Sequence, residues 1–535
     1  MKKVFKILTR VIPAILLVGF IFLTVMSISD RQVDYEVSTE GLKIPVYDEI
    51  VIEFRHDHQE DKSLPFMASA VIDIDNDGVE ELFLGGAYNQ ADAVFRFNGK
   101  QFVDISDQTG LKKNDNDATM GAVVMDIDYN GYSDLIVARE SGIWLHKNNG
   151  GRFSTEKLDA PLSADTTPLS IAIADINRDG HFDMYVSGYI RHDLVEGQNI
   201  FNKEGYGGTS AMLLNNGDNS FSDITESSGL YYKHNTFQGV FVDFDGDGLE
   251  DLVVAHDTGQ VRTWKNMGDN RFKNMPNPNS GQNSYPMGIA VSDYNNDGRV
   301  DLFFSNVGST PPDMLVKGDL RDDQILNKKW IMFENKGDFN FADVGQQRKV
   351  ADYEFSWGAV FEDFNLDGLD DLVVSENYIG FPPHRFPFMR LPGRFMLQNQ
   401  NGEFAEVGAA AGIVNKYYSI SPITADFNQD GAPDLVHVNL KDKPRAFLSQ
   451  GPSNNYLKVK LPDTVASIGA MVTVTHTDGS RLFKPFISGE GLGSDQSHVL
   501  IFGLGEGRAS TVEVSYLSGP PAIQRGDFVN TQLTF

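Results

Sequence analysis

No cysteine occurs among the 535 residues of the chain. This absence excludes disulfide bonds, thiolate metal sites and cysteine nucleophiles together. A fold that persists outside the cytoplasm without disulfides needs another stabilising device. Ions that bind only the folded state can supply one.

The sequence also lacks an excess of basic residues and the common catalytic motifs, and both absences narrow the classes of function. Asp and Glu outnumber Lys and Arg by 74 to 45, for a net charge of −29, and no run of basic residues follows the N-terminus. An acidic surface of this kind repels nucleic acid, which we therefore do not expect as a partner. The motifs H-E-x-x-H, G-x-S-x-G and G-x-G-x-x-G are absent as well, so the sequence indicates no catalytic residue and no organic cofactor.

What the chain does contain is one acidic pattern, repeated seven times at intervals of 49 to 70 residues. Every copy has oxygen-bearing side chains at its first, third, fifth and ninth positions and glycine at its sixth. Short apolar runs precede and follow the copies, which predicts two buried strands joined by an acidic loop. The copies read DIDNDGVEEL from Asp73, DIDYNGYSDL from Asp126, DINRDGHFDM from Asp175, DFDGDGLEDL from Asp243, DYNNDGRVDL from Asp293, DFNLDGLDDL from Asp363 and DFNQDGAPDL from Asp426.

The spacing of these oxygens meets the requirements of a hard divalent cation. Calcium takes six to eight oxygen ligands, and a D-x-[DN]-x-[DN]-G loop supplies them from alternate residues while the glycine allows a sharp turn. The pattern departs from an EF-hand after the ninth position, because the twelfth residue is never Glu. The predicted ligands of up to seven calcium ions, with the seventh residue contributing its carbonyl, are Asp73, Asp75, Asp77, Val79, Glu81; Asp126, Asp128, Asn130, Tyr132, Asp134; Asp175, Asn177, Asp179, His181, Asp183; Asp243, Asp245, Asp247, Leu249, Asp251; Asp293, Asn295, Asp297, Arg299, Asp301; Asp363, Asn365, Asp367, Leu369, Asp371; and Asp426, Asn428, Asp430, Ala432, Asp434.

A loop of Asp, Asn and Gly can also be a simple turn without metal, because these residues are ordinary turn formers. Seven copies with an acidic ninth residue favour metal binding over that alternative. Repetition in every module also favours a structural role for the ions over a sensory one.

The repeat length predicts the fold class. A module of about 50 residues carries one four-stranded sheet, so we expect an all-β chain with a seven-bladed β-propeller over residues 49–451. The seventh module lacks a fourth strand, and residues 49–55 resemble it, so the N-terminal strand is expected to close the ring. The loops stop near residue 452, and the strand-like runs of residues 452–535 predict a small, independent β-sandwich-like domain.

Three intervals are long because they hold insertions, which begin near Tyr189, Gly308 and Tyr378. The third, YIGFPPHRFPFMRLPGRF, combines aromatic and cationic residues in an otherwise acidic chain, which is typical of a contact surface. A Pro-rich flap packed on the sheets is the alternative. The predicted partner-binding residues are Phe381, Arg385, Phe386, Phe388, Arg390 and Arg394.

The N-terminus predicts export. A basic tail at residues 1–10 precedes an uncharged apolar run at residues 11–28, and residues 29–48 form a linker. Such a run is just long enough for a transmembrane helix, and the basic tail keeps its own end in the cytoplasm, so the bulk of the chain is expected in the periplasm or outside the cell. No A-x-A site follows, which favours an uncleaved signal anchor over a cleaved signal peptide. Export agrees with calcium binding, since calcium is abundant outside the cytoplasm.

The seven acidic hairpins resemble the FG-GAP or VCBS-type calcium-binding repeats of integrin-α-like β-propellers. The C-terminal stretches SIGAMVTVTHTDGS, GEGLGSDQSHVLIFGLG and VEVSYLSG are similar to the ASPIC/UnbV domain, although Tyr516 and Leu517 stand where that family usually has Trp-Pro. The resemblance implies a calcium-stabilised propeller used for adhesion or for contact with a protein or glycan.

The sequence thus predicts an exported, membrane-anchored module that binds a protein or glycan. Two other classes of function stay open. One is a calcium-dependent enzyme acting on polysaccharide, such as a lyase or hydrolase, since propellers can carry catalytic residues in the loops above their axis. The other is a structural subunit of a cell-envelope assembly.

Overall fold

The computed structural model describes residues 11–21, 35–111, 116–195, 205–310, 316–317 and 320–535. Nearly every element in these ranges is a β-strand, as expected from the repeat pattern. The basic tail at 1–10, the second part of the expected membrane span at 22–28 and the start of the linker at 29–34 lie outside the described residues. Parts of the first two insertions lie outside them as well.

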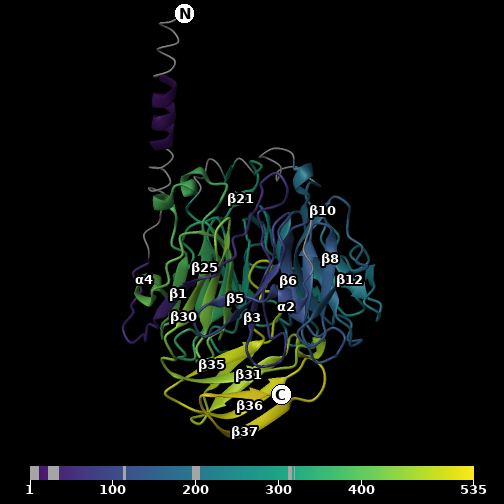
Figure 1. Cartoon of the computed structure of the whole chain (residues 1–535), viewed down its shortest axis with the longest axis vertical. Helices are drawn as coiled ribbons and strands as arrows, with labels where there is room; N and C mark the ends of the chain where they lie inside the picture. Colours follow the sequence, from purple (N-terminus) through teal and green to yellow (C-terminus); the bar gives the residue numbers. More distant parts are fainter. Residues whose placement is uncertain (1–10, 22–34, 112–115, 196–204, 311–315, 318–319) are drawn as a thin grey trace, which may run out of the picture.

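Seven antiparallel sheets of four strands follow one another along the chain, one for each acidic loop (Figure 1). The short strand β34 (Ser494–Asp495) adds to the first of them. In chain order the sheets comprise β2 (Ser69–Ile72), β3 (Glu81–Leu84), β4 (Ala93–Phe97) and β5 (Phe102–Asp104); β6 (Thr119–Met125), β7 (Asp134–Arg139), β8 (Gly142–Asn148) and β9 (Phe153–Lys157); β10 (Thr166–Ala174), β11 (Asp183–Ile190), β12 (Ala211–Asn215) and β13 (Phe221–Asp223); β14 (Thr236–Val242), β15 (Asp251–His256), β16 (Arg262–Asn266) and β17 (Phe272–Met275); β19 (Ile289–Ser292), β20 (Asp301–Phe304), β22 (Ile331–Asn335) and β23 (Phe341–Asp343); β24 (Ser356–Glu362), β25 (Asp371–Glu376), β26 (Arg394–Gln398) and β27 (Phe404–Glu406); and β28 (Tyr418–Ala425), β29 (Asp434–Leu440), β30 (Arg445–Ser449) and β1 (Tyr47–Val51).

The N-terminal strand completes the seventh sheet, as predicted. Strand β1 pairs antiparallel with β30, so that Tyr47 lies opposite Ser449 and Val51 opposite Arg445. The strand ends at Val51 rather than at residue 55. The part of the linker that the structure describes is not free, because Val37, Leu42 and Ile44 pack against the core of the sixth and seventh sheets.

The first strands of the seven sheets contact one another in a closed cycle. Each of them contacts the first strand of the sheet before it and of the sheet after it, and β28 contacts β2. These strands are apolar and almost entirely buried, which is the pattern of strands covered on both faces. The core therefore lies between adjacent sheets and toward the centre of the cycle.

The acidic loops and the insertions lie at opposite ends of the sheets. Each acidic loop joins a first strand to a second one, for example β14 to β15, whose register places Val242 opposite Asp251. The three insertions instead join second to third strands, from β11 to β12, β20 to β22 and β25 to β26. Because neighbouring strands are antiparallel, successive turns fall at alternate ends of a sheet.

Two smaller sheets form the C-terminal part of the chain at the acidic-loop end (Figure 1). One holds β31 (Asn455–Lys460), β35 (Val499–Gly505) and β38 (Thr531–Thr534), and the other holds β32 (Met471–His476), β33 (Arg481–Pro485), β36 (Ala509–Ser515) and β37 (Ala522–Phe528). Their apolar residues share a core cluster with the second and third sheets. The C-terminal part thus packs on the second and third sheets.

The remaining elements are short. They are α2 (Ser106–Thr109), α4 (Gly408–Ala411), the 3-10 helices η1 (His192–Leu194), η4 (Pro382–Arg385), η5 (Pro387–Met389) and η6 (Val465–Ser467), and the paired strands β18 (Gln282–Asn283) and β21 (Ile325–Leu326). Residues 11–21 are helical and project from the insertion end (Figure 1). Within the described ranges, no helix is both long and apolar enough to span a bilayer.

Candidate metal centres

All seven acidic loops fold in the same way. The glycine at the sixth position has a φ between +82° and +94° in every copy, which explains why only glycine stands there. Its N–H donates to a carboxylate oxygen of the first Asp in every loop, at 2.6 to 3.2 Å. The fifth side chain accepts the N–H of the seventh residue, also in all seven copies. The backbone therefore orients the carboxylates before any ion arrives.

The fourth position of each loop is left-handed as well, a feature that the sequence pattern did not indicate. Tyr129, Arg178 and Leu366 have φ values of 56°, 59° and 58° there. Such values are uncommon for residues with bulky side chains. The repeated hydrogen bonds to the first Asp hold these residues in that conformation.

The ninth carboxylate of each loop is completely buried and ties the loop to the sheet. In five loops one of its oxygens accepts the N–H of the second loop residue, as in Asp251, which binds Phe244 N at 3.0 Å. In six loops its other oxygen accepts the N–H of the last residue of the third strand, as in the 2.8 Å bond from Asn266 N. The predicted ninth ligand thus also joins the loop to the sheet through hydrogen bonds.

Three of the loops bring three carboxylates within 4.8 Å of one another. The other four loops have Asn at the third position, and in the described structure their acidic side chains do not form such a group. The three groups are Asp73, Asp75 and Asp77; Asp126, Asp128 and Asp134; and Asp243, Asp245 and Asp251.

Four buried carboxylate oxygens in the loops have no hydrogen-bond partner. They are Asp73 Oδ1, Asp245 Oδ1, Asp301 Oδ2 and Asp426 Oδ1. In Asp73 and Asp426 the other oxygen receives the glycine N–H, so the unpartnered oxygen is the one left for a further ligand. A buried anionic oxygen without a partner is costly, and a cation among the carboxylates would remove that cost. The residues present therefore fit a divalent ion with oxygen ligands.

Burial raises the pKa of the carboxyl at the ninth position of every loop. The pKa of Asp134 rises to about 7, those of Asp183 and Asp251 to about 8 and that of Asp301 to about 9, first because of desolvation and also because of the neighbouring carboxylates. A bound divalent cation opposes this effect, because it favours the charged form of every carboxylate around it.

Basic side chains of the sheets already neutralise part of the loop charge. Arg96 contacts Asp75 Oδ2 and Asp77 Oδ2 at 3.0 Å and also pairs with the ninth residue of the same loop. Lys265 pairs with Asp245 and with the fifth residue of that loop. Both come from third strands, at positions the repeat pattern does not single out.

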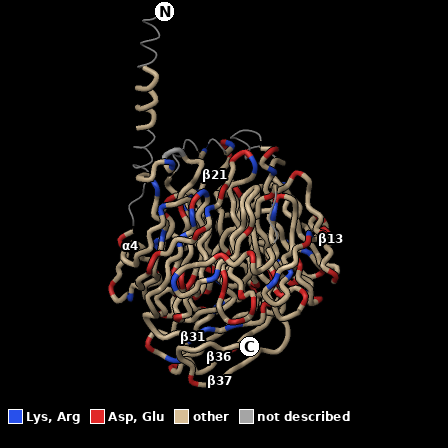
Figure 2. Tube along the Cα trace, in the orientation of Figure 1, with Lys and Arg blue, Asp and Glu red and all other residues tan. Residues whose placement is uncertain are grey.

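Two further cations come from the C-terminal part. Lys458 Nζ lies 2.8 Å from Asp426 Oδ2, and Lys460 Nζ lies 2.9 Å from Asp73 Oδ2. Both belong to β31, where alternate residues share a face, and the run YLKVKL carries that signal. Figure 2 shows acidic and basic residues side by side along this boundary.

A segment of the C-terminal part, residues 488–496, enters the centre of the cycle of first strands and is visible there as a yellow loop in Figure 1. Its residues form hydrogen bonds with five of the seven first strands. Strand β34 pairs with β2, and Gly491 exchanges two hydrogen bonds with Ile289 of β19. The other three contacts join Gln238 of β14 to Gly489 and Gly493, Val124 N of β6 to Asp495, and Thr424 N of β28 to Gln496. This plug, as we call residues 488–496, was not predicted, because its partners are far apart in sequence.

The third insertion is anchored at its base and exposed at its tip. Tyr378 stacks on Phe355 with ring centroids 4.7 Å apart. The tip exposes Arg385, Phe386 and Phe388.

The other predicted contact residues of this insertion lie elsewhere. Phe381 is half-buried and packs edge-on to His384, and Arg390 lies over the ring of Tyr418. Arg394 is buried in β26, where it pairs with Glu354 and Glu376, so it belongs to the interior and not to the exposed surface.

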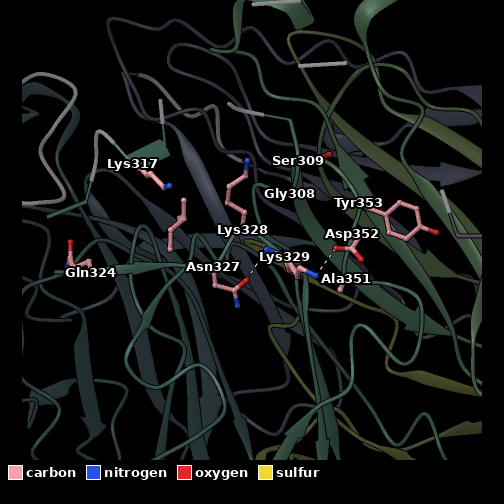
Figure 3. Close-up of a pocket in the computed structure, with 11 residues that line it drawn as sticks. Gly308, Ser309, Lys317, Gln324, Asn327, Lys328, Lys329, Ala351, Asp352 and Tyr353 are labelled. Carbon is pink, nitrogen blue, oxygen red and sulfur yellow. Dashed lines mark hydrogen bonds and ion pairs between the residues drawn. The ribbon is translucent and has the colours of Figure 1, made fainter. Parts of the chain in front are cut away.

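A cavity of about 620 Å³ lies beside the second insertion (Figure 3). Lys317, Lys328 and Lys329 line it together with Asn327 and Asp352, and Lys329 Nζ lies 3.0 Å from Asp352 Oδ1. Its size is that of a small-ligand site, and its lining of amines and amides suits hydroxyl or anionic groups.

The chain contains FG-GAP-like repeats and, after them, an ASPIC and UnbV domain. Models of these families match residues 126–186 and 243–304 for the FG-GAP-like repeat and residues 463–534 for ASPIC and UnbV. The resemblance expected from the sequence is thereby confirmed.

The chain is homologous to Cartilage acidic protein 1. It is 24% identical to the human protein over 323 residues, which cover 57% of this chain and 46% of the human one. It is also 24% identical to the Xenopus tropicalis protein, over 84% of this chain and 70% of that one. The match thus spans about half the length of the human relative.

A solved structure titled "YCF48 bound to D1 peptide" is also similar to this chain. It has a TM-score of 0.40 and 10% sequence identity, and the match covers 77% of this chain and 99% of that one.

Proposed function

We propose that the seven sheets are the blades of a β-propeller over residues 49–451 and that the acidic loops between their first and second strands bind up to seven calcium ions. The closed cycle of first strands and the completion of the seventh sheet by β1 support the propeller. The ions would have a structural role, because each loop is clasped to the sheet through its ninth residue.

The unpartnered buried carboxylate oxygens are the observation that carries the calcium proposal. The donors that converge in the loops are carboxylates, with amides and carbonyls close by, which suits calcium rather than a metal that prefers nitrogen or sulfur ligands. A bound ion would supply positive charge to the cluster. The loop backbone orients the side-chain oxygens for that ion, because the glycine N–H and the N–H of the seventh residue donate hydrogen bonds to them.

The chain is proposed to be exported and held at a membrane by its N-terminal segment. The basic tail at 1–10 and the uncharged apolar run at 11–28 support this assignment. Calcium outside the cytoplasm is abundant enough to fill weak sites of this kind.

The exported part would act as a ligand-binding module for a protein or a glycan. We place the ligand in the lysine-lined cavity (Figure 3). Among the described lining residues Asp352 is the one carboxylate, and Lys329 pairs with it. A glycosidase needs two carboxylates about the scissile bond, so this lining favours binding over hydrolysis.

Two measurements test the proposal. The full-length chain in mild detergent should melt at a lower temperature in EDTA than in 10 mM CaCl₂, whereas an equal melting temperature would contradict structural calcium. On glycan and protein arrays, Lys328→Gln should weaken a signal that Lys100→Gln, an exposed control at the acidic-loop end, leaves unchanged. Equal signals from the two variants would remove the cavity as the ligand site.

A further inference from the structure

The two ends of the molecule differ in chemistry. The acidic loops and the C-terminal sheets occupy one end, while the three insertions and the helical residues 11–21 occupy the other (Figure 1). The described part of this helix carries no charged residue (Figure 2). The insertion end is thus the end at which the chain approaches its proposed membrane anchor.

The tip of the third insertion exposes large apolar side chains at this end. Phe388 is 79% exposed and Phe386 is 44% exposed, with their ring centroids 5.9 Å apart. Residues 378–395 contain three Arg and one His but no Asp or Glu, in a chain whose net charge is −29. Paired exposed aromatics beside cationic groups mark an interaction surface rather than an ordinary loop.

The base of the insertion holds this tip away from the sheets. Asn377 Nδ2 donates to Leu391 O at 2.8 Å, and Leu391 N donates to Asn377 Oδ1 at 2.7 Å, which closes the two ends of the loop. Buried His384 accepts the N–H of Tyr378 through Nδ1 at 2.9 Å. The two phenylalanines are therefore displayed by a braced loop and do not fold back into the core.

The exposed tip is continuous with the N-terminal helix. Phe20 packs edge-on against Phe386 with ring centroids 5.5 Å apart. Around that helix Ile15, Leu16 and Val18 are 64%, 67% and 66% exposed. An exposed helix that is apolar on all sides is typical of a segment that lies in lipid, and the tip packs against it.

We propose that the tip formed by Arg385, Phe386 and Phe388 enters the same bilayer that holds the N-terminal helix. Because Phe20 stands near the middle of the apolar run at residues 11–28, the aromatic rings packed beside it would contact the acyl chains, and the Arg385 side chain would extend toward the lipid phosphates. The placement keeps the acidic loops far from the negatively charged surface of the membrane. This inference rests on the proposed anchoring.

Quenching by brominated lipid tests the inference on the full-length chain. Phe388→Trp places a reporter at the tip without disturbing the core, since that side chain is exposed. Tyr129→Trp is the matched control, because Tyr129 is 57% exposed and lies in an acidic loop at the opposite end. Both variants are reconstituted into phosphatidylcholine and phosphatidylglycerol vesicles with and without brominated acyl chains, and the signal of the unsubstituted protein is subtracted.

The added fluorescence of Phe388→Trp should fall at least twofold with brominated lipid, and that of Tyr129→Trp should not change. Equal behaviour of the two variants in floating vesicles overturns the lipid contact and leaves the anchor standing. A third outcome is that Phe388→Trp is protected from iodide but is not quenched by brominated lipid. The tip would then be covered by a protein partner or a second copy, and this outcome also overturns the inference. Failure of the protein to float with vesicles overturns the anchor and the inference together.

Discussion

Replacing Asp245 by Ala separates the calcium contribution from the rest of the fold. Asp245 Oδ1 is buried and has no hydrogen-bond partner, and its other oxygen pairs with Lys265. Lys265 keeps its 3.0 Å contact with Asp247 after the substitution. The change therefore removes one charge from a carboxylate cluster and breaks no hydrogen bond to the backbone.

The size of the effect follows from mass action. A site with a dissociation constant of about 10⁻⁴ M, at the tight end for extracellular calcium modules, stabilises the folded state by about 2.7 kcal/mol in 10 mM calcium. Asp245→Ala removes the side-chain ligand, whereas Asn, which stands at this position in four of the loops, could still bind the ion; Asp245→Ala should therefore remove most of this contribution in calcium. In EDTA the variant should differ from the unsubstituted protein by at most about 1 kcal/mol, because Lys265 keeps Asp247 as a partner and the repulsion among the carboxylates of the loop is reduced.

Thermal melts of the full-length chain in 10 mM CaCl₂ and in EDTA measure this difference, which amounts to a few degrees. Asp61→Ala is the control, since Asp61 is 79% exposed, lies outside the loops and pairs only with its neighbour Lys62 among the described ion pairs. A gap between Asp245→Ala and the unsubstituted protein that is the same in calcium and in EDTA would refute the reasoning.

Two further predictions concern the contact between the C-terminal part and the sheets. Gly431→Ala should destabilise the fold by about 2 kcal/mol more than Gly337→Ala, because both glycines have φ near +90° but a Cβ at Gly431 would lie 2.1 Å from the Tyr456 ring, while one at Gly337 meets open space; equal melting temperatures would contradict the docked arrangement. His498→Gln should cost about 3 kcal/mol at pH 6, because His498 is buried between Asp463 and Asp495, which raise its pKa well above the usual value although burial opposes them. A raised histidine pKa stabilises the folded state fully below about pH 6.5, and this stabilisation is lost as the pH rises through the raised pKa. Melts from pH 6 to 10 should therefore show the gap narrowing, and a constant gap would argue against a charged His498.

The local features of the candidate sites could be predicted because each depends on a few consecutive residues. The glycine at the sixth position, the hairpin around each loop and the pairing of β1 with β30 all follow from spacing and alternation. The left-handed fourth position could not be found this way, because residues as different as Leu366 and Tyr129 occupy it.

The long-range features could not be predicted, because no local pattern encodes them. Lys460 forms an ion pair with Asp73, although 387 sequence positions separate them. Gln238 forms hydrogen bonds with the plug, whose residues lie more than 250 positions further along the chain. Arg394 was predicted to contact a partner because it lies in the third insertion, but it is buried and pairs with Glu354. No local pattern indicates that ion pair.

The central claim is that the acidic loops hold calcium. Equilibrium dialysis of the full-length protein against 1 mM ⁴⁵Ca²⁺, with excess magnesium present, counts the ions bound to each chain. The account predicts more than one and up to seven, with at least one fewer in Asp245→Ala. A value below one ion per chain would contradict it.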